Sequence, residues 1–195
     1  MRIIFFTVFL TITQAVWAAV PVPYQGVVVL HSGQILTGQI YMPSFELIFM
    51  VSGEQRIALP VHLVRQVRFY DSGIDVNRKF EVLHYAEAGG SGLALFETVL
   101  AGQVKVLRKP RTSRLGISGG NHDEFDYYYV ADRTIVSMSK FYHQLFPLLE
   151  RELGGSIREF MRLHNLEASN TADAIQIIRF YNKRVGAHQV VAGLR

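Results

Sequence analysis

One stretch of the sequence, GGNHDEFDYYYV at residues 119–130, concentrates side chains that could bind a metal ion or act in catalysis. Its imidazole and carboxylate groups, on His122, Asp123 and Asp126, are suitable ligands for Ca²⁺ or a transition metal. Adjacent loop residues point in different directions, however, and neither the H-E-x-x-H spacing nor the D-x-[DN]-x-[DN]-G calcium pattern is present. Because Gly-Gly-Asn already favours a turn, we expect a polar loop without a metal ligand, and a metal-dependent fold is the alternative.

Three tyrosines at the end of this stretch alternate across an expected strand, so that two share one face and the third points the other way. Aromatic residues favour strands, and they also mark binding surfaces. For Tyr127, Tyr128 and Tyr129 we favour packing within the sheet, and a partly exposed binding surface is the alternative.

A basic segment precedes this stretch and supplies the candidate anion-binding residues, which are Arg108, Lys109, Arg111 and Arg114. Such a segment could attract an anionic lipid headgroup or a polysaccharide. A solvated connection is the other interpretation, because salt screens exposed charges. If the segment binds a partner, we expect it to do so together with the tyrosine strand.

A further candidate, Glu97, lies on an apolar face of a strand, together with Leu93, Leu95 and Val99. A carboxylate in such a place must find a partner or stay neutral. It could be a general acid or base with a raised pKa. It could instead be a structural carboxylate held by an Arg, a Lys or a Tyr hydroxyl from a neighbouring strand. We favour the structural role, since the sequence identifies neither a second carboxylate nor a positioned histidine.

The composition excludes several classes of site. The chain of 195 residues contains no cysteine, which excludes structural disulfides, thiolate catalysis and Cys-ligated metal centres. A hydrophobic share of 49% is sufficient for a buried core. The formal net charge of +4 is too small to indicate nucleic-acid binding, and no motif indicates a cofactor, so we expect neither.

The first residues have the pattern of a secretory signal peptide. Arg2 gives a basic start, IIFFTVFLTITQAVW an apolar middle, and Ala18 a small-residue exit. Polar Thr and Gln residues interrupt this run before it reaches the roughly 20 apolar residues that a spanning helix needs. We therefore predict a signal peptide over residues 1–18, cleaved after Ala18, and an uncleaved anchor is the alternative. The mature chain is expected in the periplasm, at the outer membrane or outside the cell, without a transmembrane span.

Residues 19–136 consist of β-favouring runs joined by turn residues, which predicts a β-rich region. Five such runs lie between residues 26 and 70, and they begin with the hairpin GVVVLHSGQILTGQI. They indicate an antiparallel meander or a small barrel-like sheet, with an Sm-like or SH3-like barrel as a fold-level analogy. Further hairpins follow up to residue 136.

Residues 137–195 change to helical spacing, which predicts about three short helices packed on the sheet. Pro147 must kink the first helix or begin a new one. The sequence SIRE at 156–159 is a capping-box pattern for the second helix. The third helix is expected to begin near Asn170 or Thr171 and to end before Gly186. Strands followed by helices make the expected fold class α+β.

The order of these motifs resembles a group of uncharacterised exported proteins from Bacteroidetes-type bacteria. The shared order comprises GVVVLHSGQILTGQI, KFEVLHYAE, LFETVLAGQVKVLRK, YYYVADRTIVSMSKFYHQLFPLL and the closing AIQIIRFYNK. This resemblance extends over nearly all of the mature chain. It implies export and the layout of the fold, and because the group has no established activity, no catalytic residue or cofactor follows from it.

We therefore expect a non-enzymatic binding or structural module of the cell envelope, whose partner is an envelope protein, a polysaccharide or an anionic headgroup. The alternative is a hydrolase that acts on envelope material through Glu97 or the His122–Asp126 cluster. That alternative requires Glu97 to converge with His84, His122 or Asp126 at a pocket.

Overall fold

The computed structural model describes four segments of the chain, residues 23–42, 45–87, 90–110 and 125–192. Some of the features predicted from the sequence lie outside the described residues, namely the signal peptide, Arg111, Arg114, His122 and Asp123. The other candidate site residues lie inside them.

Ten described strands form one antiparallel sheet. They are β1 (Tyr24–Leu30), β2 (Ile35–Tyr41), β3 (Leu47–Ser52), β4 (Gln55–Pro60), β5 (Val64–Asp71), β6 (Val76–Glu87), β7 (Gly90–Leu100), β8 (Lys105–Pro110), β9 (Phe125–Ala131) and β10 (Thr134–Ser137). Their order in the sheet is β10-β9-β8-β7-β6-β5-β1-β2-β3-β4. Consecutive strands are neighbours except where β5 follows β4, because β5 returns through the 3-10 turn η1 (Val61–Leu63) to pair with β1. The predicted meander is confirmed, but the sheet ends at β4 and β10, so the barrel alternative is wrong.

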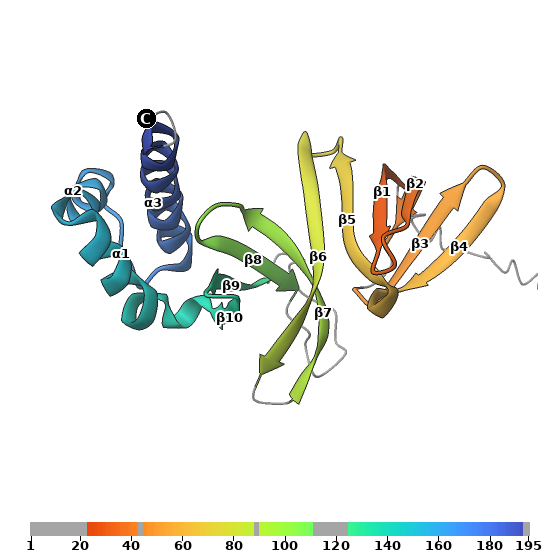
Figure 1. The fold of residues 1–195 in the computed structure, drawn as a ribbon, viewed down its shortest axis with the longest axis horizontal. Helices are drawn as coiled ribbons and strands as arrows, with labels where there is room; N and C mark the ends of the chain where they lie inside the picture. Colours follow the sequence, from red (N-terminus) through yellow and green to blue (C-terminus); the bar gives the residue numbers. More distant parts are fainter. Residues whose placement is uncertain (1–22, 43–44, 88–89, 111–124, 193–195) are drawn as a thin grey trace, which may run out of the picture.

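The remaining described chain is helical. It comprises the 3-10 turn η2 (Met138–Lys140), the π-helical turn η3 (Phe141–Leu145), α1 (Phe146–Leu153), α2 (Gly155–His164) and α3 (Thr171–Ala192). Figure 1 shows the helices at one end of the molecule and β1–β4 at the other, with the long strands β6 and β7 between them. The expected fold class, α+β with a C-terminal group of helices, is confirmed.

Details of the helix ends differ from the expectation in two places. The capping box at 156–159 is absent, because the Ser156 hydroxyl donates to the Leu153 carbonyl and the N-cap of α2 is Gly154. Asn170 does cap α3, since its Oδ1 accepts from the backbone N–H groups of Ala172 and Asp173. That helix then continues through Gly186, because one glycine in a helix interior costs only about 1 kcal/mol relative to alanine.

A pair of glycines allows close approach within the first half of the sheet. Gly26 in β1 faces Gly38 in β2. A Cβ atom on Gly26 would lie 2.3 Å from the backbone oxygen of Arg68, and one on Gly38 would lie 2.2 Å from that of Val51. Only glycine fits at these positions, and its absent side chains let β3 and β5 approach β2 and β1 closely on the side of the core.

One face of the sheet, called the inner face, carries two separate hydrophobic cores. The first core is formed by β1–β6 with contributions from η1 and β7, and its fully buried members are Val28, Ile40, Ile48, Met50, Val64 and Val67. The second core lies between β8–β10 and the helices, and its fully buried members are Val106, Phe141, Ile157, Ile177 and Ile178. A small third cluster, Phe96, Leu107 and Tyr128, lies on the opposite or outer face. The expectation that the short helices dock on the sheet is met by the second core.

An asparagine side chain ties α3 to the turn between β7 and β8. Asn182 Oδ1 accepts from the Val104 backbone N–H at 2.9 Å, and its Nδ2 donates to the Val104 carbonyl at 2.8 Å. The amide therefore replaces the backbone of a neighbouring strand. Gly102, with φ of +154°, packs against it so closely that a Cβ atom there would lie 2.4 Å from the Asn182 side chain.

Candidate functional site

The carboxylate of Glu97 lies on the inner face, between the first and the second core. On β7, Leu95 belongs to the first core and Val99 packs against the second. Residues two apart on a strand share a face, so Glu97 occupies the boundary between them. It is 6% exposed. A charge in this position requires compensation from neighbouring strands.

Two arginines supply that compensation. Arg78 in β6 donates from Nε to Glu97 Oε1 at 2.9 Å and from Nη2 to Oε2 at 2.8 Å, which makes the pair bidentate. Arg108 in β8 donates from Nε to Oε2 at 2.9 Å. Arg78 also donates from Nη1 to Asp71 Oδ2 at 3.3 Å. These four residues, Asp71, Arg78, Glu97 and Arg108, form what we call the ionic seam.

The seam holds Glu97 in its ionised form. Burial by itself raises the pKa of Glu97, but hydrogen bonds from Arg78 and Arg108 outweigh burial, so the pKa lies below its ordinary value. A general acid needs a raised pKa, and the pKa of Glu97 is shifted in the opposite direction. The two guanidinium groups also lie over aromatic rings, Arg78 over Phe80 at 5.1 Å and Arg108 over Phe125 at 4.2 Å. The arrangement matches a structural carboxylate held by neighbouring strands.

Two of the proposed catalytic partners, His84 and Asp126, lie among the described residues, and neither meets Glu97. Glu97 pairs across the sheet with Phe80, whereas His84 pairs with Leu93. Four residues along a strand separate Phe80 from His84, which corresponds to about 13 Å. Asp126 adjoins Tyr127, the cross-strand partner of Arg108, so its side chain points to the outer face. Within the described segments, no group of three or more His, Cys, Asp or Glu side chains is placed to hold a metal ion.

The tyrosine strand is β9, and its side chains alternate as predicted. Tyr128 is 2% exposed and packs edge-to-face against Phe96 in the third cluster. Tyr129, also 2% exposed, points into the second core, and its hydroxyl donates to Gln144 at 3.4 Å. Tyr127 is half-buried beside the same core. Packing within the sheet therefore describes all three tyrosines.

Of the basic candidates, two are described, and both lie in strand β8 rather than in a loop. Arg108 belongs to the ionic seam. Lys109 points to the outer face, where its Nζ lies 4.6 Å from the ring centre of Tyr85 and 5.7 Å from that of Tyr128. Both cations are thus engaged with groups of the protein. The joint surface of tyrosines and basic side chains stays a prediction, because Arg111 and Arg114 lie outside the described residues.

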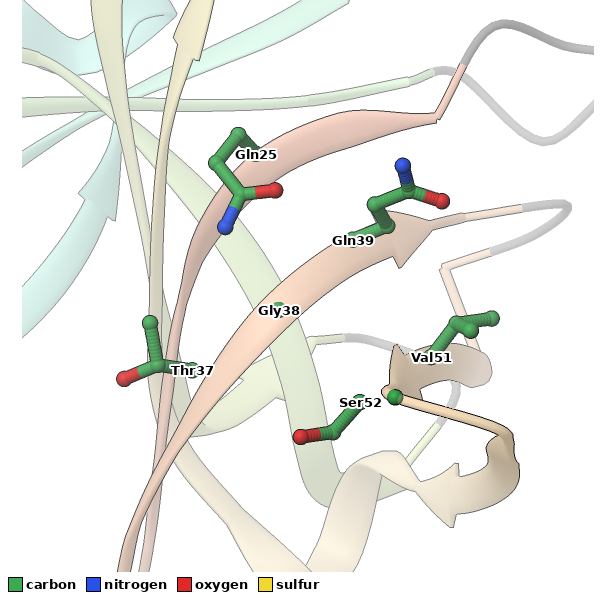
Figure 2. A pocket seen from close by; sticks show the side chains of 7 residues that line it. Gln25, Thr37, Gly38, Gln39, Val51 and Ser52 are labelled. Carbon is green, nitrogen blue, oxygen red and sulfur yellow. The ribbon is translucent and has the colours of Figure 1, made fainter.

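The structure instead presents a groove on the outer face of the first half of the sheet. One hollow of about 290 Å³ is lined by residues of β1–β3 and the following turn, including Gln25, Thr37, Gln39 and Ser52 (Figure 2). A second hollow of about 630 Å³ is lined by residues of β1, β5 and β6, including Gln25, Arg68, Tyr70, Asn77 and Lys79. Because Gln25 lines both hollows, we treat them as one polar groove.

The strand register lines up the side chains of this groove. Gln25 faces Gln39 across β1 and β2, and Tyr70 faces Asn77 across β5 and β6. Gly26 pairs with Phe69, so Gln25 and Tyr70 occupy the next position on β1 and β5. The four side chains therefore form one row across four strands, and adjacent strands lie about 4.8 Å apart.

The charge around the groove is positive. The Arg68 guanidinium donates from Nη2 to the Gln66 amide at 3.2 Å. Lys79 and Lys105 share one carboxylate, Glu81, at 2.5 Å and 2.8 Å. Burial raises the pKa of Glu81, but the hydrogen bonds from Lys105 and Lys79 outweigh it and lower the pKa, so this carboxylate is ionised. Three cations, Arg68, Lys79 and Lys105, thus stand against two carboxylates on this part of the face, Glu81 and the Asp75 that binds the Tyr70 hydroxyl.

The tyrosine at the centre of the row is held by an acidic neighbour. The Tyr70 hydroxyl donates to Asp75, and this hydrogen bond, followed by burial, raises the pKa of Tyr70. The tyrosine side chain nevertheless remains 48% exposed. The groove therefore combines amide and hydroxyl groups, a guanidinium and an exposed aromatic ring, which can hydrogen-bond to a polar ligand and pair with an anion.

Sequence reasoning missed the groove, although part of its signal is present. Thr37 and Gln39 were recognisable as the polar face of a half-buried strand. Their neighbours on β5 and β6 were not, because the sequence contains no local sign that β5 returns to pair with β1.

Comparison with known proteins adds no assignment: the chain matches no family model, no curated protein and no solved structure. The described helices include none that is both long enough and apolar enough to cross a membrane.

Proposed function

We propose that the protein is an exported, non-enzymatic binding or structural module of the bacterial cell envelope, and that the polar groove is its binding surface. The groove carries this proposal, because it is a continuous row of polar side chains that no described helix covers. The described helices pack instead on the inner face, in the second core. Polar groups aligned on an exposed sheet face can engage an external partner without rearrangement of the fold.

The ionic seam supports the non-enzymatic part of the proposal. Glu97 is one of the two catalytic candidates that the sequence offered, and both of its oxygens accept hydrogen bonds from arginines. A carboxylate with a lowered pKa and two bound guanidinium groups is a poor proton donor near neutral pH.

The proposed address rests on the amino-acid sequence. Residues 1–18 have the three parts of a signal peptide. The order of motifs resembles the exported group from Bacteroidetes-type bacteria, and we propose that the chain belongs to that group. A protein in the cell envelope can meet three kinds of partner, namely an envelope protein, a polysaccharide or an anionic headgroup.

Fractionation of the native cell combined with site-specific photo-crosslinking tests the proposal. A photoreactive amino acid is placed at Thr37 in the groove, and in a matched variant at the exposed Arg179 of α3. We expect the protein in the envelope fraction and a crosslinked partner from position 37 but not from position 179. A cytoplasmic protein, or identical crosslinks from both positions, would contradict the proposal.

A further inference from the structure

We infer that the polar groove binds an acidic polysaccharide and that Arg68 pairs with a carboxylate of the polymer. This inference rests on the proposed function, because it names the ligand class of the same surface. Three features of the groove carry it: the extent of the polar row, the chemistry of its side chains and the sign of its charge.

The extent of the row suits a chain rather than a compact ligand. Gln39, Gln25, Tyr70 and Asn77 lie on four adjacent strands. With about 4.8 Å between strands, the row extends over about 14 Å. Small-molecule sites are usually enclosed and largely apolar, whereas this row is exposed and polar at every position. A polymer that lies across the strands can contact each member of the row in turn.

The side chains of the row match the chemistry of sugars. A carboxamide both donates and accepts hydrogen bonds, and so does each hydroxyl of a sugar ring. Gln25, Gln39 and Asn77 thus provide three such groups, with the hydroxyl of Thr37 beside them. The exposed ring of Tyr70 offers an apolar surface on which the C–H groups of a sugar can pack. Because Asp75 binds the Tyr70 hydroxyl, this ring is held in place.

The charge of the groove favours an anionic polymer. The side chain of Arg68 is exposed, and within the described part of the chain it contacts the amide of Gln66. Because this amide is uncharged, it does not neutralise the Arg68 guanidinium group. A planar guanidinium fork fits a carboxylate in bidentate geometry. Lys79 and Lys105 pair with Glu81, and Asp75 at the Tyr70 hydroxyl offsets the second lysine, so the net positive charge of this part of the face is that of Arg68. A carboxylate of the polymer at Arg68 therefore lies in a positive field.

An anionic membrane surface fits these residues less well. Attachment to such a surface uses clusters of four or more basic side chains and apolar groups that enter the bilayer. In the groove, Arg68 contacts the neutral amide of Gln66 and faces Lys79 across β5 and β6, and Lys79 already contacts a carboxylate. Anionic vesicles are therefore the comparison ligand in the test.

The test measures binding of the full chain to three probes by isothermal titration calorimetry. The probes are polygalacturonate, the same polymer after reduction of its carboxyl groups, and vesicles of phosphatidylglycerol. We expect the acidic polymer to bind, with an affinity that falls as salt is added, and the other two to bind at least tenfold more weakly. The variant Arg68→Gln should lose about tenfold in affinity for the acidic polymer, because a charge-assisted pair is removed.

Two further variants keep the test decisive. Arg179→Gln removes an exposed arginine from α3, outside the groove, and should bind like the unmodified chain. The double variant Gln25→Ala with Gln39→Ala should weaken binding although it changes no charge. Because all four side chains are exposed, unchanged melting temperatures are expected for these variants and serve as the control for folding.

The inference is overturned if Arg68→Gln binds the acidic polymer as tightly as Arg179→Gln does. Equal affinity for the reduced polymer, or binding to vesicles and not to the polymer, overturns it as well. An envelope protein crosslinked at position 37, without polymer binding, would reject the ligand class and leave the proposed function standing. A cytoplasmic location would reject the proposed function itself.

Discussion

The two halves of the sheet bury the same face in different ways. In the first half, strands β1–β6 and the turn η1 form a core among themselves, and the glycine pair Gly26 and Gly38 permits the close approach that this requires. In the second half, three strands supply one side of the core and the helices supply the other. The first half thus depends on the fit of backbone to backbone, whereas the second depends on how firmly the helices are attached. The outer face of the first half takes no part in this core and carries the polar groove.

The ionic seam is where the two halves meet. Apolar residues of β7 on either side of Glu97 belong to different cores. Two arginines and two carboxylates cover the gap with directed hydrogen bonds instead of packing. Such a junction fixes the register of β6, β7 and β8, and it is sensitive to the loss of any one partner.

The largest effect is expected from Arg78→Met, which removes the central cation of the seam. Glu97 and Asp71 would lose their Arg78 partner while remaining largely buried, and we expect the free energy of unfolding to fall by about 3 kcal/mol. Denaturant unfolding measures this. Lys79→Met, at the next position of β6 but on the outer face, is the control and should cost less than about 1 kcal/mol. Equal losses for the two variants would show that the seam has no special role.

A somewhat smaller effect is expected from Glu97→Gln, about 2 kcal/mol at neutral pH, because charge-assisted hydrogen bonds become neutral ones. The pKa of Glu97 in the folded protein lies below its ordinary value. Its contribution to stability is therefore complete above the ordinary glutamate pKa of about 4.3 and is lost as the pH falls through the lower folded pKa.

The acid limb of the stability curve checks this pH dependence. Glu97→Gln should lose less stability between pH 5 and pH 2 than the unmodified chain does, when unfolding is followed at each pH. Glu54→Gln, in the exposed turn between β3 and β4, is the control and should keep the unmodified acid limb. Parallel acid limbs for all three proteins would contradict a titrating seam.

Asn182→Ala tests how the second half is held together. The N–H and C=O groups of Val104 would lose their partners, and we expect a loss of about 1.5 kcal/mol. Hydrogen exchange of the Val104 amide should become faster, while that of Val28 in the first half stays the same. Lys183→Ala, at an exposed neighbouring position, is the control. Loss of protection in both halves would mean that they unfold as one unit.

The smallest effect is expected from Tyr181→Phe, about 1 kcal/mol at neutral pH, because one hydrogen bond to Glu152 is removed. Burial, followed by the contact with Glu152, raises the pKa of Tyr181 to about 12. Its contribution is therefore complete below the ordinary tyrosine pKa of about 10 and is lost as the pH rises through about 12.

Alkaline unfolding of the second half is the measurement for this variant. Tyr181→Phe should remove part of the alkaline loss of stability, and Tyr142→Phe, whose side chain is 49% exposed, should leave it unchanged. A greater effect from Tyr142→Phe would place the base-sensitive contact elsewhere.

Local features of the fold could be predicted from the sequence. Hairpins with short turns, the alternation of Tyr127 to Tyr129 and the capping of α3 by Asn170 all depend on neighbouring residues. The expected end of α3 before Gly186 was wrong, because the helix formers around a single glycine outweigh its cost. The pairing of strands that lie far apart in the sequence could be seen only in the structure.

The candidate site shows the same division. Alternation placed Glu97 on an apolar face, but its partners Arg78 and Arg108 come from the strands on either side, whose register is fixed by pairing across the whole sheet. The groove was missed entirely, because its row combines β1 and β2 with β5 and β6. No short stretch of sequence contains both pairs.

The central position of β1 has a consequence for the order of folding. Strands β5–β10 pair in sequence order, so each hairpin can form as soon as its second strand is available. Strand β1 emerges first during synthesis, yet its second edge waits until Val28 can meet Val67 in β5. Closing a loop of this length slows folding and leaves an unpaired edge exposed in the meantime. Among the described strands that have two neighbours, β1 therefore waits longest for its second one, and chaperones that protect strand edges would act on it longest.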